Sequence, residues 1–135
     1  MNKYKAGAGL PNLERLVIKY FLVPNVRLLF TWKLSLFFIN REVKIIKKLL
    51  ENVKKEDLQK RVFIERAFAI EDHSRDYSIN MTLEHLRITG TAIMSVIDTL
   101  SNEQEVTQEI TIEAVKPKDN SNTEPEQFFS FMEKY

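Results

Sequence analysis

The feature that most constrains the fold is an apolar seam in the first half of the chain. Its members are spaced alternately four and three residues apart, at Trp32, Leu36, Ile39, Val43, Ile46, Leu50 and Val53. This spacing places them on one face of an α-helix and is typical of the contact between bundled helices. The chain has only three Gly and four Pro, too few for an architecture of strands and tight turns. We therefore predict an all-α fold.

A first helix is expected near the N-terminus, because Asn12 is a favourable N-cap and apolar residues follow it. We predict that it runs to about Val23, where Pro24 breaks or kinks it, since proline cannot donate to the helix ladder. The 135 residues have the length of one domain. That domain is predicted to comprise an N-terminal extension helix and an up-down helical bundle, in residues 1–30 and 31–135 respectively.

The third helix is predicted to start at the N-cap Ser78 and to run to about Leu100. Its apolar residues cover most of its circumference, which is typical of an inner helix with neighbours on several sides. Gly90 would let one neighbour approach closely. The sequence T-E-P-E from Thr123 has the pattern of a capping box and predicts a last helix. Residues 106–115 alternate in part and predict an isolated strand or an extended connection.

The composition excludes several classes of site. Cysteine is absent, which rules out disulfides, thiolate metal sites and cysteine nucleophiles. The sequence contains no phosphate-binding loop, dinucleotide-binding or serine-hydrolase motif. The N-terminus lacks the apolar core of a secretory signal, and charged residues interrupt the most apolar region. We expect a cytoplasmic protein with no membrane span.

The two halves of the chain carry opposite charge. Residues 1–66 hold 15 Lys and Arg against 6 Asp and Glu, whereas residues 67–135 hold 5 against 13. A basic half can indicate nucleic acid or an anionic membrane surface as a partner. The alternative is that the halves neutralise each other within one chain or across a homodimer. We predict the dimer and no nucleic-acid binding, because the sequence has no recognition-helix or base-stacking motif.

His85 is the main candidate for a chemical role. It lies inside the apolar arc of the third predicted helix, where an imidazole needs partners for both ring nitrogens. It is therefore either a core histidine with local hydrogen bonds or a metal ligand. The neighbouring positions on its helix face contain no His, Asp or Glu. The other histidine, His73, lies in the preceding loop.

The run E-D-H-S-R-D-Y-S and the following N-M-T-L-E-H-L resemble the DinB-like superfamily of metal-binding four-helix bundles. In that family an aromatic-Ser pair opens the second bundle helix, and a histidine in its first turns is the first metal ligand. Tyr77 and Ser78 match that pair, although the family usually has Trp at the first of these positions, and His85 matches the ligand. By helix order the resemblance covers roughly residues 30–102.

The resemblance implies a divalent metal (Zn, Ni or Fe) bound by His85 and by two histidines in an H-x-x-x-H arrangement on a last helix. This sequence contains no such motif. The predicted helix after Thr123 corresponds to the family's third, so the bundle is expected to be incomplete. A longer form of the protein would be expected to carry the two missing histidines within its next fifty residues. His73 is a weaker candidate to replace one of them.

Two functional hypotheses result. The first is a DinB-like metal-binding protein, with thiol-transferase or hydrolase-like chemistry and a small thiol partner if the missing helix completes the site. The alternative is a non-catalytic helical protein that forms a homodimer through its apolar faces and its oppositely charged halves. Whether the chain is an enzyme is left open by these residues.

Overall fold

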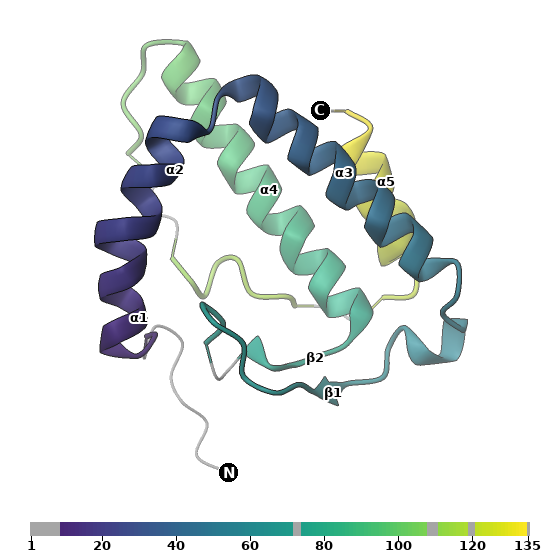
Figure 1. The fold of residues 1–135 in the computed structure, drawn as a ribbon. Coiled ribbons are helices and arrows are strands. Elements are labelled where there is room, and N and C mark those ends of the chain that lie inside the picture. The colour runs from purple at the N-terminus through teal and green to yellow at the C-terminus, as the bar shows by residue number, and fades with distance from the viewer. Residues whose placement is uncertain (1–8, 72–73, 108–110, 119–120, 135) are drawn as a thin grey trace.

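The computed structural model describes residues 9–71, 74–107, 111–118 and 121–134. It is mostly helical, which confirms the all-α class (Figure 1). The described residues contain five α-helices, α1 to α5, which are joined by short irregular elements and one short pair of strands. Their bounds are α1 Asn12–Val17, α2 Val23–Leu29, α3 Trp32–Leu50, α4 Ile79–Ser101 and α5 Glu124–Met132.

The first helix continues past Pro24, contrary to the predicted break. A π-helical segment, Ile18–Leu22, joins α1 to α2, and Pro24 occupies the first turn of α2. Proline is tolerated there because its missing N–H is not needed, and the wider π turn accommodates its ring. The N-cap is Pro11 rather than Asn12, whose side chain instead accepts a hydrogen bond from Arg15.

The α1 helix is tied to a distant loop by an ion pair that the sequence did not suggest. The Nη1 and Nη2 atoms of Arg66 donate to the Glu14 carboxylate, at 2.7 and 2.6 Å, and the Ala69 N–H donates to it at 3.2 Å. The hydrogen bond from Arg66 lowers the pKa of Glu14. The contact therefore contributes to stability above the ordinary glutamate range and is lost as the pH falls through the lowered pKa.

The segment between α3 and α4 contains a 3-10 turn, Lys55–Asp57, and two short antiparallel strands. Strand β1, Val62–Phe63, pairs with β2, Asp76–Tyr77, so the chain returns to the start of α4. The β1 side chains are exposed. Of the large apolar residues in this segment, Leu58 is buried, whereas Val62, Phe63, Ile64 and Phe68 are exposed.

The α4 helix begins as predicted. The Ser78 hydroxyl accepts a hydrogen bond from the Met81 N–H at 3.1 Å, and Ser78 is almost fully buried. Capping of this kind satisfies one of the free N–H groups at a helix start. The α4 helix then runs for 23 residues and forms the centre of the fold.

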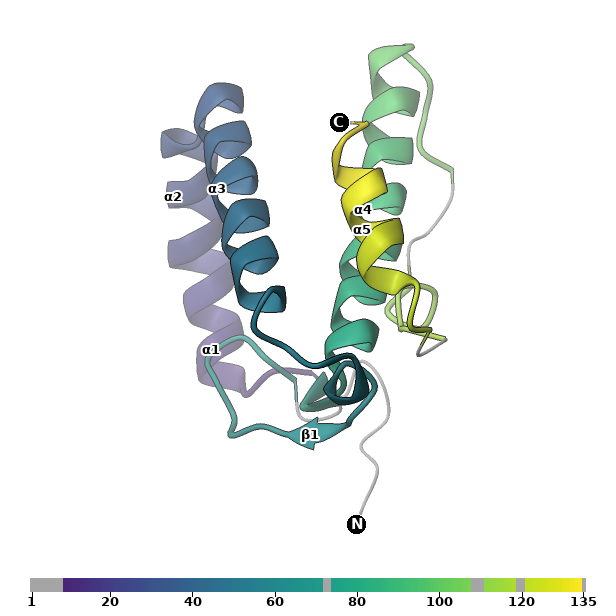
Figure 2. The same ribbon diagram turned by 90° about the vertical axis from the view of Figure 1, so that its right-hand side faces the viewer.

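The α5 helix packs along α4 in the same direction, which differs from the up-down order expected. Asn80 lies near Asn122, Arg87 pairs with Glu124, and Gly90 meets Phe131, so the numbers rise together along both helices. The described parts of the connection between the helices, residues 102–107, 111–118 and 121–123, lie along the way back to the start of α4 (Figures 1 and 2). Because this connection is long enough to return to the start of α4, α5 can pack parallel to α4.

The α4–α5 contact combines close packing with buried charge. A Cβ built on Gly90 would lie 2.8 Å from the Phe131 ring, so the predicted close approach at this glycine is confirmed.

Buried charge also joins the two helices. Glu124 is only 2% exposed, and its carboxylate accepts hydrogen bonds from Arg87 Nε at 2.6 Å and from Arg87 Nη2 at 3.1 Å. This hydrogen bond raises the pKa of Arg87. Glu84 is also buried, and its Oε1 accepts from the Lys118 N–H at 3.0 Å.

The helices form two layers, with α1, α2 and α3 in one and α4 and α5 in the other (Figure 2). The buried apolar side chains of the described residues are Leu58, Leu83 and Phe128, which belong to α4, α5 and the loop beneath them. Seventeen of the twenty-six exposed large apolar residues in the described chain belong to residues 12–50. The α1–α3 layer is therefore largely uncovered.

The described part of residues 106–115 contains no strand. Residues 112–115 form turns, and the Ala114 N–H donates both to the Thr111 carbonyl at 3.1 Å and to its hydroxyl at 3.3 Å. A hydroxyl that accepts a local backbone bond competes with strand pairing. Residues 108–110 lie outside the described residues.

Candidate functional site

His85 lines an open cavity of about 1140 Å³ at the end of the molecule that contains β1 and β2. The α4 helix supplies one wall through Thr82, His85 and Thr89, and the residues at its start supply Tyr77 and Ser78. The same cavity is bordered by Asn52, Val53 and Lys54, which follow the C-terminal end of α3, and by Ile112 and Val115 of the 112–115 turn. The α4 helix, which Ser78 caps, therefore places His85 at the wall of this cavity.

The His85 ring is fixed by its Nδ1 atom, which lies 2.7 Å from the carbonyl oxygen of Val115. A carbonyl only accepts hydrogen bonds, so Nδ1 carries the proton and donates. The other ring nitrogen, Nε2, is then the unprotonated one in the neutral imidazole. Tyr77 contacts the ring edge to face, with ring centroids 6.4 Å apart. This tautomer is the one in which Nε2 is available to bind a metal ion.

Thr89, one helical turn after His85, has a buried hydroxyl that also borders the cavity. No described residue forms a hydrogen bond with this hydroxyl. Buried polar atoms in proteins nearly always have a partner, so an unpaired one at a cavity wall is consistent with a bound polar group or water. The sequence did not indicate Thr89 as a site residue, because nothing distinguishes it from the other residues on that side of the helix.

The structure does not bring other ligands to His85. Within the described ranges, no three His, Asp or Glu side chains lie close enough together to hold a metal ion. Glu84 is adjacent in sequence, but its carboxylate accepts the Lys118 N–H. His73, the weaker candidate, lies outside the described residues. The described residues therefore do not complete a metal site around His85, although Asp57 and Glu71 border the same cavity.

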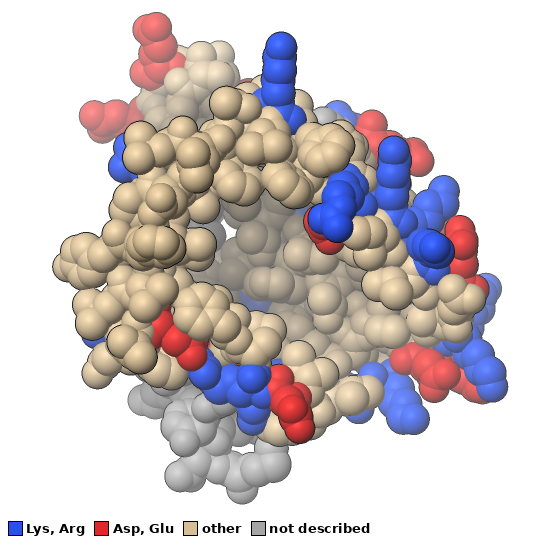
Figure 3. Space-filling model, viewed as in Figure 1, with Lys and Arg blue, Asp and Glu red and all other residues tan. Residues whose placement is uncertain are grey.

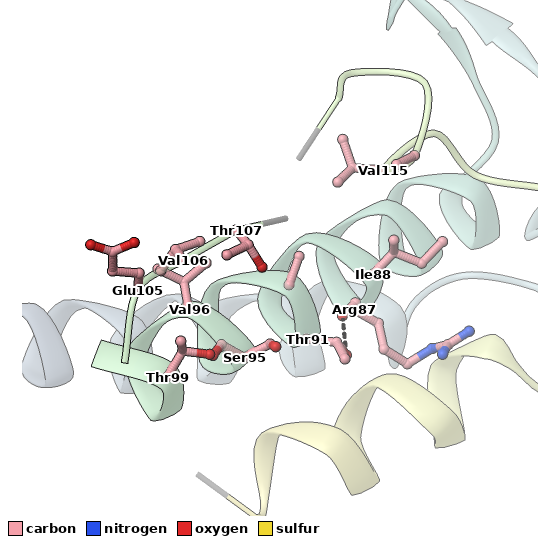
Figure 4. A pocket seen from close by; sticks show the side chains of 12 residues that line it. Arg87, Ile88, Thr91, Ser95, Val96, Thr99, Glu105, Val106, Thr107 and Val115 are labelled. Carbon is pink, nitrogen blue, oxygen red and sulfur yellow. Dashed lines mark hydrogen bonds between the residues drawn. The ribbon is translucent and has the colours of Figure 1, made fainter. Parts of the chain in front are cut away.

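A second cavity, of about 550 Å³, lies on another flank of α4 (Figure 4). Figure 4 shows Thr91, Ser95 and Thr99 in a row along the helix, below Val106 and Thr107. The Thr91 and Thr99 hydroxyls donate to carbonyls of their own helix at 2.9 and 2.8 Å, and Arg87 is paired with Glu124. Since these polar groups are already paired, the His85 cavity is the stronger candidate site.

No described helix is by itself both long and apolar enough to cross a membrane; Asn12–Leu29 and Trp32–Leu50 pass that test only as a pair, bent by 105°. The sequence matches no protein-family model, and no curated protein or solved structure matches it.

Proposed function

We propose that the chain is a DinB-like helical module that contributes His85 to a divalent-metal site. The observation that carries the proposal is the 2.7 Å contact between His85 Nδ1 and the Val115 carbonyl. Ligand histidines commonly donate one N–H to a carbonyl or carboxylate, which orients the ring and leaves the other nitrogen for the metal. The cavity beside His85 gives that nitrogen access to further ligands.

The remaining ligands are proposed to come from residues outside the described part of the chain. The resemblance to the DinB-like superfamily implies two histidines on a further helix, and a metal held in this way can activate a thiol or a water molecule. Since the described residues provide one ligand, we derive no reaction step. Thiol transfer and hydrolysis stay proposals that depend on completion of the site.

We expect purified wild-type protein to bind Zn²⁺, Ni²⁺ or Fe²⁺ and the His85→Ala variant to bind it at least about tenfold more weakly, because a ligand is lost. Elemental analysis after dialysis and calorimetric titration of the metal would measure this difference. Thr82→Ala is the matched control, since Thr82 borders the same cavity one turn earlier. Equal metal content in wild type and His85→Ala would make His85 a structural histidine.

A second candidate function is that of a homodimeric interaction protein. The α4 helix carries Leu86, Ile93 and Leu100 at seven-residue intervals, and these side chains are 41, 51 and 59% exposed. Apolar residues repeated at seven-residue intervals lie on one side of a helix and are typical of the seam through which two helices pair. A second copy could cover this stripe.

We expect the wild type to be a dimer at micromolar concentration in low salt and Ile93→Lys to be a monomer, because a charge would be placed in the apolar stripe. Analytical ultracentrifugation would separate the two states. Val106→Lys, at a position similarly exposed but in the loop after α4, is the control. High salt should weaken the dimer, since it screens the opposite charges, and a chelator should not. A monomeric wild type would exclude this candidate.

A further inference from the structure

The elbow between α2 and α3 presents apolar side chains to solvent. Its sequence is R-L-L-F-T-W-K, from Arg27 to Lys33. Leu28 is 84% exposed, Leu29 67% and Trp32 65%, in a chain whose two helical runs meet at 105°. Three large exposed side chains therefore lie at the bend, where α2 ends and α3 begins. We call Leu28, Leu29 and Trp32 together the elbow tip.

The elbow is held in shape by local contacts. The Thr31 hydroxyl caps α3 by accepting from the Leu34 N–H at 3.3 Å. The Phe30 ring turns back and stacks on Phe38, with centroids 5.6 Å apart. The Thr31 cap and the Phe30–Phe38 stack therefore fix the bend between α2 and α3.

All the charged residues near the tip in the sequence are basic. From Arg15 to Arg41 the sequence contains five cations and no Asp or Glu. Arg27 and Lys33 flank the tip directly, and neither forms an ion pair with a described residue. Figure 3 shows a broad uncharged surface over α1 and α2, with Lys and Arg gathered along α3.

We propose that the elbow tip inserts into the surface of an anionic lipid bilayer. Exposed Trp and Leu favour the boundary between headgroups and acyl chains, where an apolar body can be buried. Lysine and arginine at the rim are attracted to anionic headgroups. The 105° bend lets both helices lie against the surface instead of crossing it. This inference goes beyond metal binding and does not depend on it.

The experiment uses the full chain, in which Trp32 is the single tryptophan and therefore reports on the tip alone. Its fluorescence would be followed while phosphatidylcholine vesicles, with or without phosphatidylglycerol, are added in the presence of a chelator. We expect a blue shift and co-sedimentation with the phosphatidylglycerol vesicles. Replacement of both flanking cations, Arg27→Gln with Lys33→Gln, should weaken that binding about 30-fold, since each basic residue near an anionic surface contributes a factor of about five and the two factors multiply.

Leu28→Glu should abolish the shift, because it places a carboxylate in the tip. Leu49→Glu is the matched control on the same layer, since Leu49 is 64% exposed at the far end of α3. All these positions are exposed, so circular dichroism should show unchanged helix content. Binding that is equal for neutral vesicles, absent for all vesicles, or lost equally in Leu49→Glu would overturn the proposal. A blue shift that tracks protein concentration without lipid would also overturn it, because a second copy would then cover the tip.

Discussion

Removal of the Arg87 guanidinium should destabilise the protein by about 3–5 kcal/mol, because Glu124 would be left buried without its cation. The two side chains form two hydrogen bonds, at 2.6 and 3.1 Å, and the Glu124 side chain is only 3% exposed. Solvent therefore offers little compensation to the carboxylate. Arg87→Met keeps much of the apolar stem and removes the charge. Urea unfolding followed by circular dichroism would measure the loss as a lower transition midpoint.

The chain offers a matched surface pair as the control. Arg41 and Glu42 are 2.9 Å apart, but both side chains are 55% exposed. Arg41→Met should therefore change the free energy of unfolding by no more than about 1 kcal/mol. Replacing both buried partners, Arg87→Met with Glu124→Met, should restore much of the lost stability, since no uncompensated charge remains. If Arg87→Met cost no more than Arg41→Met, the pair would not hold α5 to α4.

The Arg87–Glu124 pair also marks the limit of what the sequence predicts. Arg87 and Glu84 are charged residues of the predicted helix, and charged side chains are ordinarily exposed to solvent. The structure buries Glu84 and pairs Arg87 with a residue 37 positions later. The Glu14–Arg66 contact spans 52 positions in the same way. Such pairings depend on how the helices pack, and no local propensity encodes them.

Helix starts were predictable where one side chain determines them. Ser78 caps α4 because its hydroxyl reaches the Met81 N–H within the same turn. Pro24 was misjudged because the sequence does not show the π turn that accommodates it. The parallel course of α5 had a detectable signal: more than twenty residues separate Leu100 from Thr123, enough chain to return along α4.

For His85, the sequence predicted the position in the helix but not the hydrogen-bond partner. Its position on an apolar flank left a core histidine and a metal ligand as alternatives. The structure supplies an acceptor for Nδ1, as a core histidine needs, but leaves Nε2 without a hydrogen-bond partner among the described residues, as a metal ligand needs. The acceptor, Val115, lies 30 residues away in a turn that the sequence pattern had assigned to a strand or extended connection. The tautomer could therefore not be deduced before the fold was known.

Gly90→Val should destabilise the protein by about 2–3 kcal/mol, because the α4–α5 contact has no room for a side chain at this position. A Cβ there would lie 2.8 and 2.9 Å from two atoms of the Phe131 ring, and valine adds two further methyl groups. Chemical unfolding would measure the loss. Gly90→Ala should cost less, since alanine favours the helix by about 1 kcal/mol over glycine and offsets part of the steric penalty.

Replacing Phe131 with the smaller leucine would show whether the ring causes the loss of stability at Gly90. In a Phe131→Leu background, Gly90→Ala should be neutral or stabilising, because the space once filled by the ring end is free and the helix propensity of alanine remains. The double-mutant cycle should then show a favourable coupling of at least about 1 kcal/mol between the two positions. Thr91→Ala, on the exposed neighbouring position, should show no coupling with Phe131. Additive effects at Gly90 and Phe131 would mean that the two residues are not in contact and that α5 packs elsewhere on α4.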